Sequence, residues 1–258
     1  LSRRGVRAGD RVMILMLNRT EFVESVLAAN MLGGIAVPVN FRLTPPEIAY
    51  LVGDCEARVL ITEPALVPVA TGVRELTELL ETVVVAGAPS DSDAGLIGYE
   101  DLIDETGEPH APVDIPNDSP ALIIYTSGTT GLPKGAVLTH TNLLGQTMTA
   151  LHTSGTGTAD VAFIGVPFFH IAGVGNLLPG MWLGIPTVIN PLGAFDAGQL
   201  LDVLAAERVT GIFLVPAQWQ AVCAEQQANP RDICLRTMSW GAAPASDALL
   251  RQMAETFP

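Results

Sequence analysis

Short apolar runs rich in β-branched residues alternate with segments of helical periodicity along this chain. Residues 11–17 form one such run, and the apolar residues of 20–32 recur at the spacing of one helix face. Gly33 and Gly34 end that predicted helix, and residues 35–39 form the next predicted strand. Strands that alternate with helices pair in parallel, because each helix carries the chain back to the starting edge of the sheet. The sequence therefore predicts an α/β fold of mostly parallel sheets flanked by helices.

The same alternation continues to the last residues. Thr44, the two prolines after it and Glu47 predict a helix start, because Thr caps the first turn and Glu completes a capping box. Further strands are predicted at residues 58–61, 82–85, 120–125, 161–166, 187–189, 211–215 and 236–239. Further helices are predicted at residues 141–151, 197–207, 217–226 and 246–255.

Residues 90–118 interrupt the alternation with many acidic residues, no Lys or Arg, and several Gly, Ser and Pro. Such a charge run is typical of a solvated connector, and a functional acidic segment is the alternative. We expect a first α/β subdomain at residues 1–153, which contains this acidic connector and a phosphate loop at 125–135. A second α/β subdomain, incomplete at its C-terminus, is expected at residues 154–258.

Composition excludes a disordered chain and two classes of binding partner. The chain has 13 Lys and Arg against 27 Asp and Glu, a net charge of −14, and 48% of its residues are hydrophobic. This hydrophobic content excludes a disordered chain, which could not bury enough apolar surface to fold. A strongly acidic surface repels phosphates, so nucleic acids and anionic membrane surfaces are excluded as well.

The cysteines and histidines predict neither a disulfide framework nor a metal site. Cys55, Cys223 and Cys234 are odd in number and lack the spacing of metal ligands, and the four histidines lack it too. We therefore expect buried, reduced thiols, no protein-bound metal and a cytoplasmic location. The chain opens without Met and without a signal peptide, and we interpret it as a piece of a longer protein.

A long uncharged stretch raises the alternative of a membrane span. No Asp, Glu, Lys or Arg occurs in residues 161–195, which is long enough to cross a bilayer. Gly and Pro recur throughout the stretch and would interrupt a spanning helix. We therefore predict short strands and a buried helix here.

The loop at residues 125–135 carries the clearest chemical signal, with the sequence YTSGTTGLPKG after a buried strand. Its glycines let the backbone approach a ligand, its hydroxyls donate hydrogen bonds, and Lys134, the one lysine of the chain, supplies a compact positive charge. This combination predicts a polyphosphate site. A phosphotransferase loop of the Walker type is disfavoured, because Pro133 precedes Lys134 and Gly135 stands where Ser or Thr would hold magnesium.

The same loop resembles the signature loop of the adenylate-forming (AMP-binding) superfamily. Other segments agree with that family in order along the chain: GDRV at 9–12, EF at 21–22, LGGIAVPVN at 32–40, PFFH at 167–170 and WGAAP at 240–244. The resemblance is closest to fatty-acid and other acyl-CoA synthetases. It implies two stacked sheets that belong to a truncated large domain of the acyl-CoA synthetase fold.

The resemblance also implies a set of site residues. The phosphates of ATP would be bound by Thr126, Ser127, Gly128, Thr129, Thr130, Gly131 and Lys134. Adenine would be contacted by Gly241, Ala242, Ala243 and Pro244, and the acid by Phe169, His170 and Trp240. Catalytic roles would fall to Lys134, to Thr126 and to His170, which would steer the carboxylate. Trp240 stands where a small residue is expected and would shorten the acyl tunnel.

The implied reaction is the ATP-dependent activation of a carboxylic acid, with a fatty acid expected, to an acyl-adenylate and pyrophosphate. A thioester with CoA would follow, and Mg²⁺ would share the neutralisation of phosphate charge. The family's magnesium-binding Glu, ribose-binding Asp and mobile-domain Lys find no match in this chain, so we expect it to be inactive alone. The alternatives are adenylation for a carrier protein, or a noncatalytic module that binds ATP or an acyl group.

Overall fold

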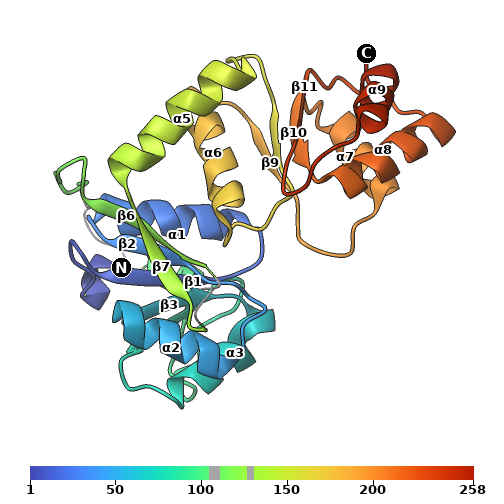
Figure 1. Cartoon of the computed structure of the whole chain (residues 1–258). Coiled ribbons are helices and arrows are strands. Elements are labelled where there is room, and N and C mark those ends of the chain that lie inside the picture. The colour runs from blue at the N-terminus through green and yellow to red at the C-terminus, as the bar shows by residue number, and fades with distance from the viewer. Residues whose placement is uncertain (105–110, 127–130) are drawn as a thin grey trace. The chain divides into compact units, whose positions relative to one another are not determined.

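A computed structural model of the protein describes residues 1–104, 111–126 and 131–258 (Figure 1). The chain forms two compact units, of which the first comprises Leu1–Leu144 together with Phe168–Ile171. The second comprises Gly145–Pro167 and Ala172–Pro258. The boundary therefore falls inside a helix, about one helix turn after it begins, and a short later segment belongs to the first unit.

The first unit is built on a seven-stranded sheet with the order β5-β4-β3-β1-β2-β6-β7. Its strands are β1 (Arg11–Leu15), β2 (Ile35–Pro38), β3 (Val59–Thr62), β4 (Thr82–Val85), β5 (Leu96–Gly98), β6 (Pro120–Thr126) and β7 (Lys134–Thr139). Strands β1 to β6 pair in parallel, and β7 runs antiparallel to β6. The predicted α/β architecture with a mostly parallel sheet is confirmed.

Helices cover both faces of this sheet. They are the short 3-10 helices η1 (Ser2–Arg4) and η2 (Pro64–Leu66), and the α-helices α1 (Thr20–Met31), α2 (Pro45–Cys55), α3 (Val67–Arg74) and α4 (Tyr99–Asp104). Figure 1 shows α1 on one side of the sheet and α2 and α3 on the other. Because β1 is central and covered on both faces, Val12, Met13, Ile14 and Leu15 are fully buried.

Helix α2 begins as predicted. The backbone N–H and the hydroxyl of Thr44 both donate to Glu47 Oε2 at 2.7 Å, which forms the expected capping box. The two hydrogen bonds lower the pKa of Glu47. The start of α2 is therefore determined by four consecutive residues.

Several elements of the first unit were not expected from the sequence. Strand β7 includes Lys134 and Gly135, which the sequence pattern places in the loop, and its antiparallel pairing with β6 is a long-range hydrogen-bond pattern. The acidic connector contains β5 and α4, and Tyr99 is buried with its hydroxyl donating to Glu24 Oε2 at 2.7 Å. A three-residue strand is too short to produce a periodic signal. Residues 105–110 lie outside the described part of the connector.

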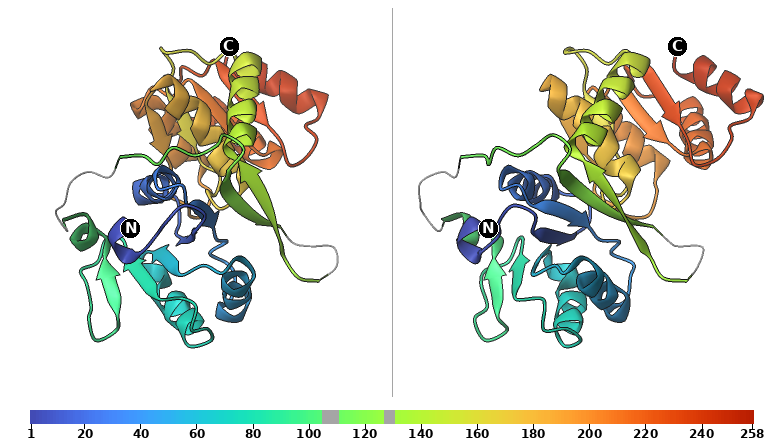
Figure 2. Two further views of the ribbon diagram at one scale, coloured as in Figure 1. Left: turned by 90° about the vertical axis from the view of Figure 1, so that its left-hand side faces the viewer. Right: turned by 60° about the vertical axis from the view of Figure 1, so that its left-hand side comes forward.

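The second unit is built on a four-stranded parallel sheet with the order β11-β10-β8-β9 (Figure 2). Its strands are β8 (Ala162–Ile164), β9 (Thr187–Ile189), β10 (Gly211–Leu214) and β11 (Thr237–Trp240). Its helices are α5 (His140–Ser154), which begins in the first unit, α6 (Ile171–Leu183), α7 (Ala197–Ala206), α8 (Pro216–Ala228) and α9 (Asp247–Thr256). Each corresponds to a predicted strand or helix within a few residues.

Trp219 anchors the core of the second unit. Its side chain is fully buried, packs edge-on against Phe257 and donates from Nε1 to the Ser239 carbonyl at 2.9 Å. The uncharged stretch forms β8, α6 and β9, and α6 buries three glycines along with Val174 and Leu177. Within the described residues, every helix is too short or too polar to cross a bilayer.

Candidate functional site

The phosphate loop joins β6 to β7. Strand β6 ends at Thr126, and the chain is described again from Gly131, whose φ of 109° favours glycine. Thr126 and Lys134 are register partners on the two strands, so the two stems of the loop lie opposite each other. The predicted residues Thr126, Gly131 and Lys134 are thus brought together. The predicted residues Ser127, Gly128, Thr129 and Thr130 lie outside the described residues.

The segment Phe168–Ile171 is anchored to the first unit by contacts with residues far away in sequence. Asn18, which follows β1 and is buried, accepts a hydrogen bond from the Phe168 backbone N–H at 2.9 Å. The Phe168 ring stacks on Phe22, with ring centroids 5.0 Å apart. The Phe169 ring contacts Phe41 edge-on at 5.4 Å. Because of these contacts, His170 belongs to the same unit as the sheet that bears the phosphate loop.

A cavity of about 810 Å³ lies between the loop stems, α2 and this segment. Thr126, Gly131, Phe169 and His170 all line it, together with the tyrosines at 50 and 125 and several aliphatic side chains. Its volume lies in the range of small-molecule sites. The first unit therefore brings two predicted phosphate residues, Thr126 and Gly131, and two predicted acid residues, Phe169 and His170, around one cavity, whereas Lys134 is not among its lining residues.

Helix α2 contacts both stems of the loop. Tyr125 donates from its hydroxyl to Asp54 Oδ2 at 2.6 Å, and burial followed by this hydrogen bond raises the pKa of Tyr125. Tyr50 donates to the Pro133 carbonyl oxygen at 3.4 Å. Tyr50 and Asp54 are not among the predicted site residues, although their spacing of four residues places them on one helix face.

The described residues do not fit a magnesium site by themselves. Glu47 lines the cavity, but its carboxylate is already engaged by the capping box. Across the described ranges, no three or more His, Cys, Asp and Glu side chains are grouped so that they could hold a metal ion. The cationic and hydroxyl groups of Lys134 and Thr126 instead fit an anionic phosphate.

The remaining predicted residues belong to the second unit. Trp240 ends β11 with 43% of its surface exposed, and Ala242 adopts a left-handed φ of 65°. A Cβ on Gly241 would lie 3.0 Å from the Phe213 ring, a tight contact that would make the ring shift by a few tenths of an ångström. Ala243 and Pro244 line a groove beside α8 and α9. Trp240 and residues 241–244 thus belong to the second unit, whereas the residues that line the larger cavity belong to the first.

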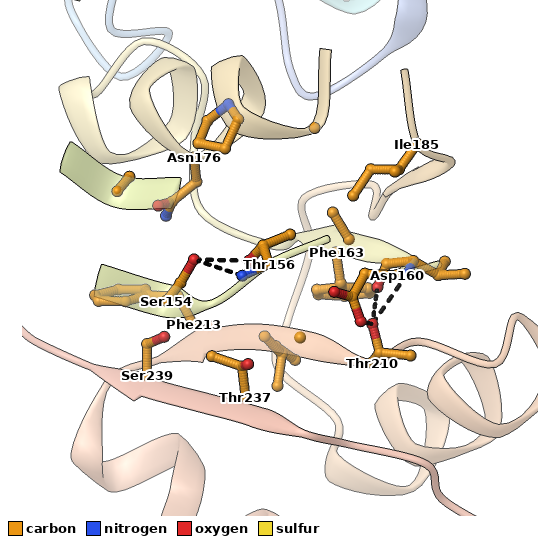
Figure 3. A pocket seen from close by; sticks show the side chains of 17 residues that line it. Ser154, Thr156, Asp160, Phe163, Asn176, Ile185, Thr210, Phe213, Thr237 and Ser239 are labelled. Atoms are coloured by element: carbon orange, nitrogen blue, oxygen red, sulfur yellow. Dashed lines mark hydrogen bonds between the residues drawn. The ribbon is translucent and has the colours of Figure 1, made fainter. Parts of the chain in front are cut away.

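The second unit has a smaller cavity of about 120 Å³ beside its sheet (Figure 3). Asp160 lines it and accepts hydrogen bonds from Thr210 Oγ1 at 2.7 Å, Gly157 N at 2.8 Å and Arg236 Nη2 at 2.9 Å. Burial alone would raise the pKa of Asp160, but these three partners outweigh burial and lower it. The hydrogen bonds of the Asp160 carboxylate thus hold three segments of the second unit together, which indicates a structural role for this residue.

One histidine and the three cysteines lie away from the cavity lining. His140 begins α5, and burial lowers its pKa. The three cysteines are free, and Cys234 is only partly buried, contrary to the expectation. Cys55 and Cys223 are buried as expected, and burial raises the pKa of each. Neither thiol therefore has the lowered pKa of a reactive cysteine.

Comparison with known proteins places this geometry in a family. The family model described as "AMP-binding enzyme" matches residues 1–258. A feruloyl-CoA synthase of Amycolatopsis sp is 36% identical over 93% of this chain, and a fatty acid–[acyl-carrier-protein] ligase of Streptomyces coeruleorubidus is 32% identical over 96%. The chain spans 45% and 46% of these two relatives, about half of their length.

Similarity to solved structures agrees with the sequence comparison. The crystal structure of the anthranilate CoA ligase AuaEII in complex with anthranoyl-AMP has a TM-score of 0.90 and 28% identity. The match covers 99% of this chain and 50% of that one. The acyl-CoA synthetase type of α/β fold is therefore confirmed, and the chain belongs to the AMP-binding enzyme family.

Proposed function

We propose that this chain forms the ATP-handling part of an adenylate-forming ligase that joins a carboxylic acid to a thiol. In the first step, the carboxylate attacks the α-phosphorus of ATP, which forms an acyl-adenylate and releases pyrophosphate. In the second step, the thiol of CoA displaces AMP and a thioester forms. The observation that carries this proposal is the cavity shared by the loop stems and the segment that contains His170.

Each predicted residue that the structure describes has a role in this proposal. Lys134 and Thr126 bind and orient the phosphates, and the loop stems at Gly131 let the backbone approach them. His170 and Phe169 orient the acid, since both line the cavity beside the loop. Trp240 contributes to the acid site, and the residues from Gly241 to Pro244 contact adenine.

We propose an acid with an apolar tail, a fatty acid being the expected example, because aromatic and aliphatic side chains line most of the cavity. The relatives act on different acids by name, one on a feruloyl group and one on a fatty acid. The second of them uses an acyl-carrier protein, so a carrier-bound thiol is the alternative acceptor to CoA. Cytoplasmic ATP and CoA would supply both steps.

A noncatalytic module that binds ATP or an acyl group is the second candidate. It needs only the loop stems and the cavity beside them, which the first unit provides. Such a module would bind the nucleotide without releasing pyrophosphate. Both candidates therefore bind the nucleotide, but only the ligase releases pyrophosphate.

Binding and turnover test the proposal separately. ATP and inorganic tripolyphosphate are titrated calorimetrically into this chain, and carboxylate-dependent exchange of labelled pyrophosphate into ATP is measured with the longest natural polypeptide that contains it. Octanoate, palmitate, benzoate and ferulate serve as acids. Exchange with one of them supports the ligase, and binding without exchange supports the noncatalytic module. A chain that binds neither ATP nor tripolyphosphate would refute both.

Lys134→Ala extends this test to one residue. The substitution should weaken tripolyphosphate binding by about tenfold or more, because a charged hydrogen-bond donor is lost. Thermal stability should change little, because Lys134 is exposed. Arg208→Ala is the matched control, since it removes the same charge from an exposed ion pair with Asp232 in the second unit. Equal effects of the two substitutions would remove Lys134 from the proposed site.

A further inference from the structure

Both stems of the phosphate loop contact one face of α2. The stem before the loop does so through Tyr125, whose hydroxyl donates to Asp54 Oδ2 at 2.6 Å. The stem after the loop does so through the Pro133 carbonyl oxygen, which accepts from the Tyr50 hydroxyl at 3.4 Å. Because Tyr50 and Asp54 are four residues apart on one helix, they lie about one turn from each other. Helix α2 therefore contacts both stems of the loop.

The position of the Tyr125 ring explains why the loop sequence ends in glycine. Tyr125 and Gly135 are register partners on the antiparallel strands β6 and β7. A Cβ on Gly135 would lie 2.8 Å from Ile123 Cγ2 and 3.2 Å from Tyr125 Cζ. A side chain at residue 135 would therefore displace the ring that carries the hydroxyl to Asp54. The glycine and the carboxylate together define one orientation of Tyr125.

We propose that Asp54 is a positioning residue for polyphosphate binding, which holds the loop stem through Tyr125 and acts with Tyr50 at the other stem. This inference rests on the proposed function, because it assumes that the loop binds phosphates. The physical reason is entropic. Stems that hydrogen bonds already hold in place lose less conformational entropy when a ligand is bound.

Electrostatics predicts the opposite sign for the same residue. Asp54 is a negative charge bonded to the stem of a loop that is proposed to bind a polyanion, in a chain of net charge −14. If its effect were only coulombic, removal of the charge would strengthen tripolyphosphate binding. If Asp54 positions the loop stem, its removal weakens binding. The sign of the change in affinity therefore distinguishes positioning from a bystander charge.

The experiment measures the affinity of the 258-residue chain for inorganic tripolyphosphate and for ATP by calorimetry, with a melting temperature for every variant. Asp54→Ala and Tyr125→Phe should each weaken binding by about tenfold, because each removes the same hydrogen bond to a carboxylate. The double variant should bind about as weakly as either single variant. Asp54→Asn keeps an acceptor for the Tyr125 hydroxyl and should retain most of the affinity.

Glu56→Ala is the matched control. It removes an equal charge two residues away, where the carboxylate pairs with Arg11 instead of the loop stem. The affinity of this variant should be unchanged or slightly higher. If the wild-type chain binds tripolyphosphate and Asp54→Ala binds it equally or more tightly, the positioning role is overturned and the proposed function stands. If the wild-type chain does not bind either probe, the proposed function fails and the positioning role with it.

Discussion

Phe168→Ala should strongly destabilise the first unit, whereas Phe169→Ala should affect ligand binding more than stability. The Phe168 side chain is 1% exposed and stacks on Phe22. Removal of a fully buried Phe costs about 3–5 kcal/mol, through lost transfer free energy and the cavity left behind. Phe169 is half-buried, makes an edge contact with Phe41 and lines the cavity. Its removal should cost about 1–2 kcal/mol, because less surface returns to water.

Urea unfolding measures this difference, and the aromatic residues of the chain separate its two units. All three tyrosines lie in the first unit, and all three tryptophans lie in the second. Tyrosine signals therefore report on the first unit and tryptophan emission on the second. With a denaturant slope of about 2 kcal/mol per molar urea, Phe168→Ala should lower the tyrosine-detected midpoint by about 1.5–2.5 M.

The two variants control for each other, because they are the same substitution at adjacent positions. Phe169→Ala should lower the midpoint by less than about 1 M and should weaken binding of the acid identified by the exchange assay. An equal loss of stability in the two variants would refute the assignment of Phe168 to the core and Phe169 to the cavity. A loss below about 1 kcal/mol for Phe168→Ala would refute the anchoring of its segment on the first unit.

Three further predictions concern buried hydrogen bonds. Asn18→Leu leaves the Phe168 backbone N–H without this acceptor, so urea unfolding should show a loss of about 1–3 kcal/mol in the tyrosine-detected transition. Trp219→Phe removes the donor to the Ser239 carbonyl, and the second unit should lose about 1–3 kcal/mol by differential scanning calorimetry. The pKa of Asp160 is lower in the folded chain than in the unfolded one, so its contribution is present above about pH 4 and is lost as the pH falls through the folded value. In acid titrations followed by tryptophan emission, Asp160→Asn should therefore flatten the loss of stability, and a profile that matches wild type would contradict this.

Local elements could be predicted from the sequence because their causes lie within a few residues. The capping box of Thr44 and Glu47 starts α2, and the β-branched run at Thr82–Val85 forms β4 with the predicted bounds. Asp196 and Ser246 likewise cap α7 and α9 through their side chains. The loop chemistry is also local, since its glycines, hydroxyls and single lysine are contiguous.

Pairings between distant residues could not be predicted in this way. Strand β7 exists because β6 offers it an edge, and its own residues are exposed or half-buried and show no alternating pattern. The return of Phe168–Ile171 to the first unit depends on Asn18, 150 residues earlier in the chain. Each of these contacts forms only after the packing of the core has placed the two segments side by side.

The sequence by itself therefore determined the α/β class, the loop chemistry and the family resemblance, because each is written in contiguous residues. The tertiary structure decided that His170 and the loop stems share a cavity and that α2 contacts both stems. The physical reason is the range of the interactions involved. Hydrogen bonds and side-chain periodicity within a helix or strand act over a few residues, whereas the geometry of the site follows from packing between elements that the chain visits far apart.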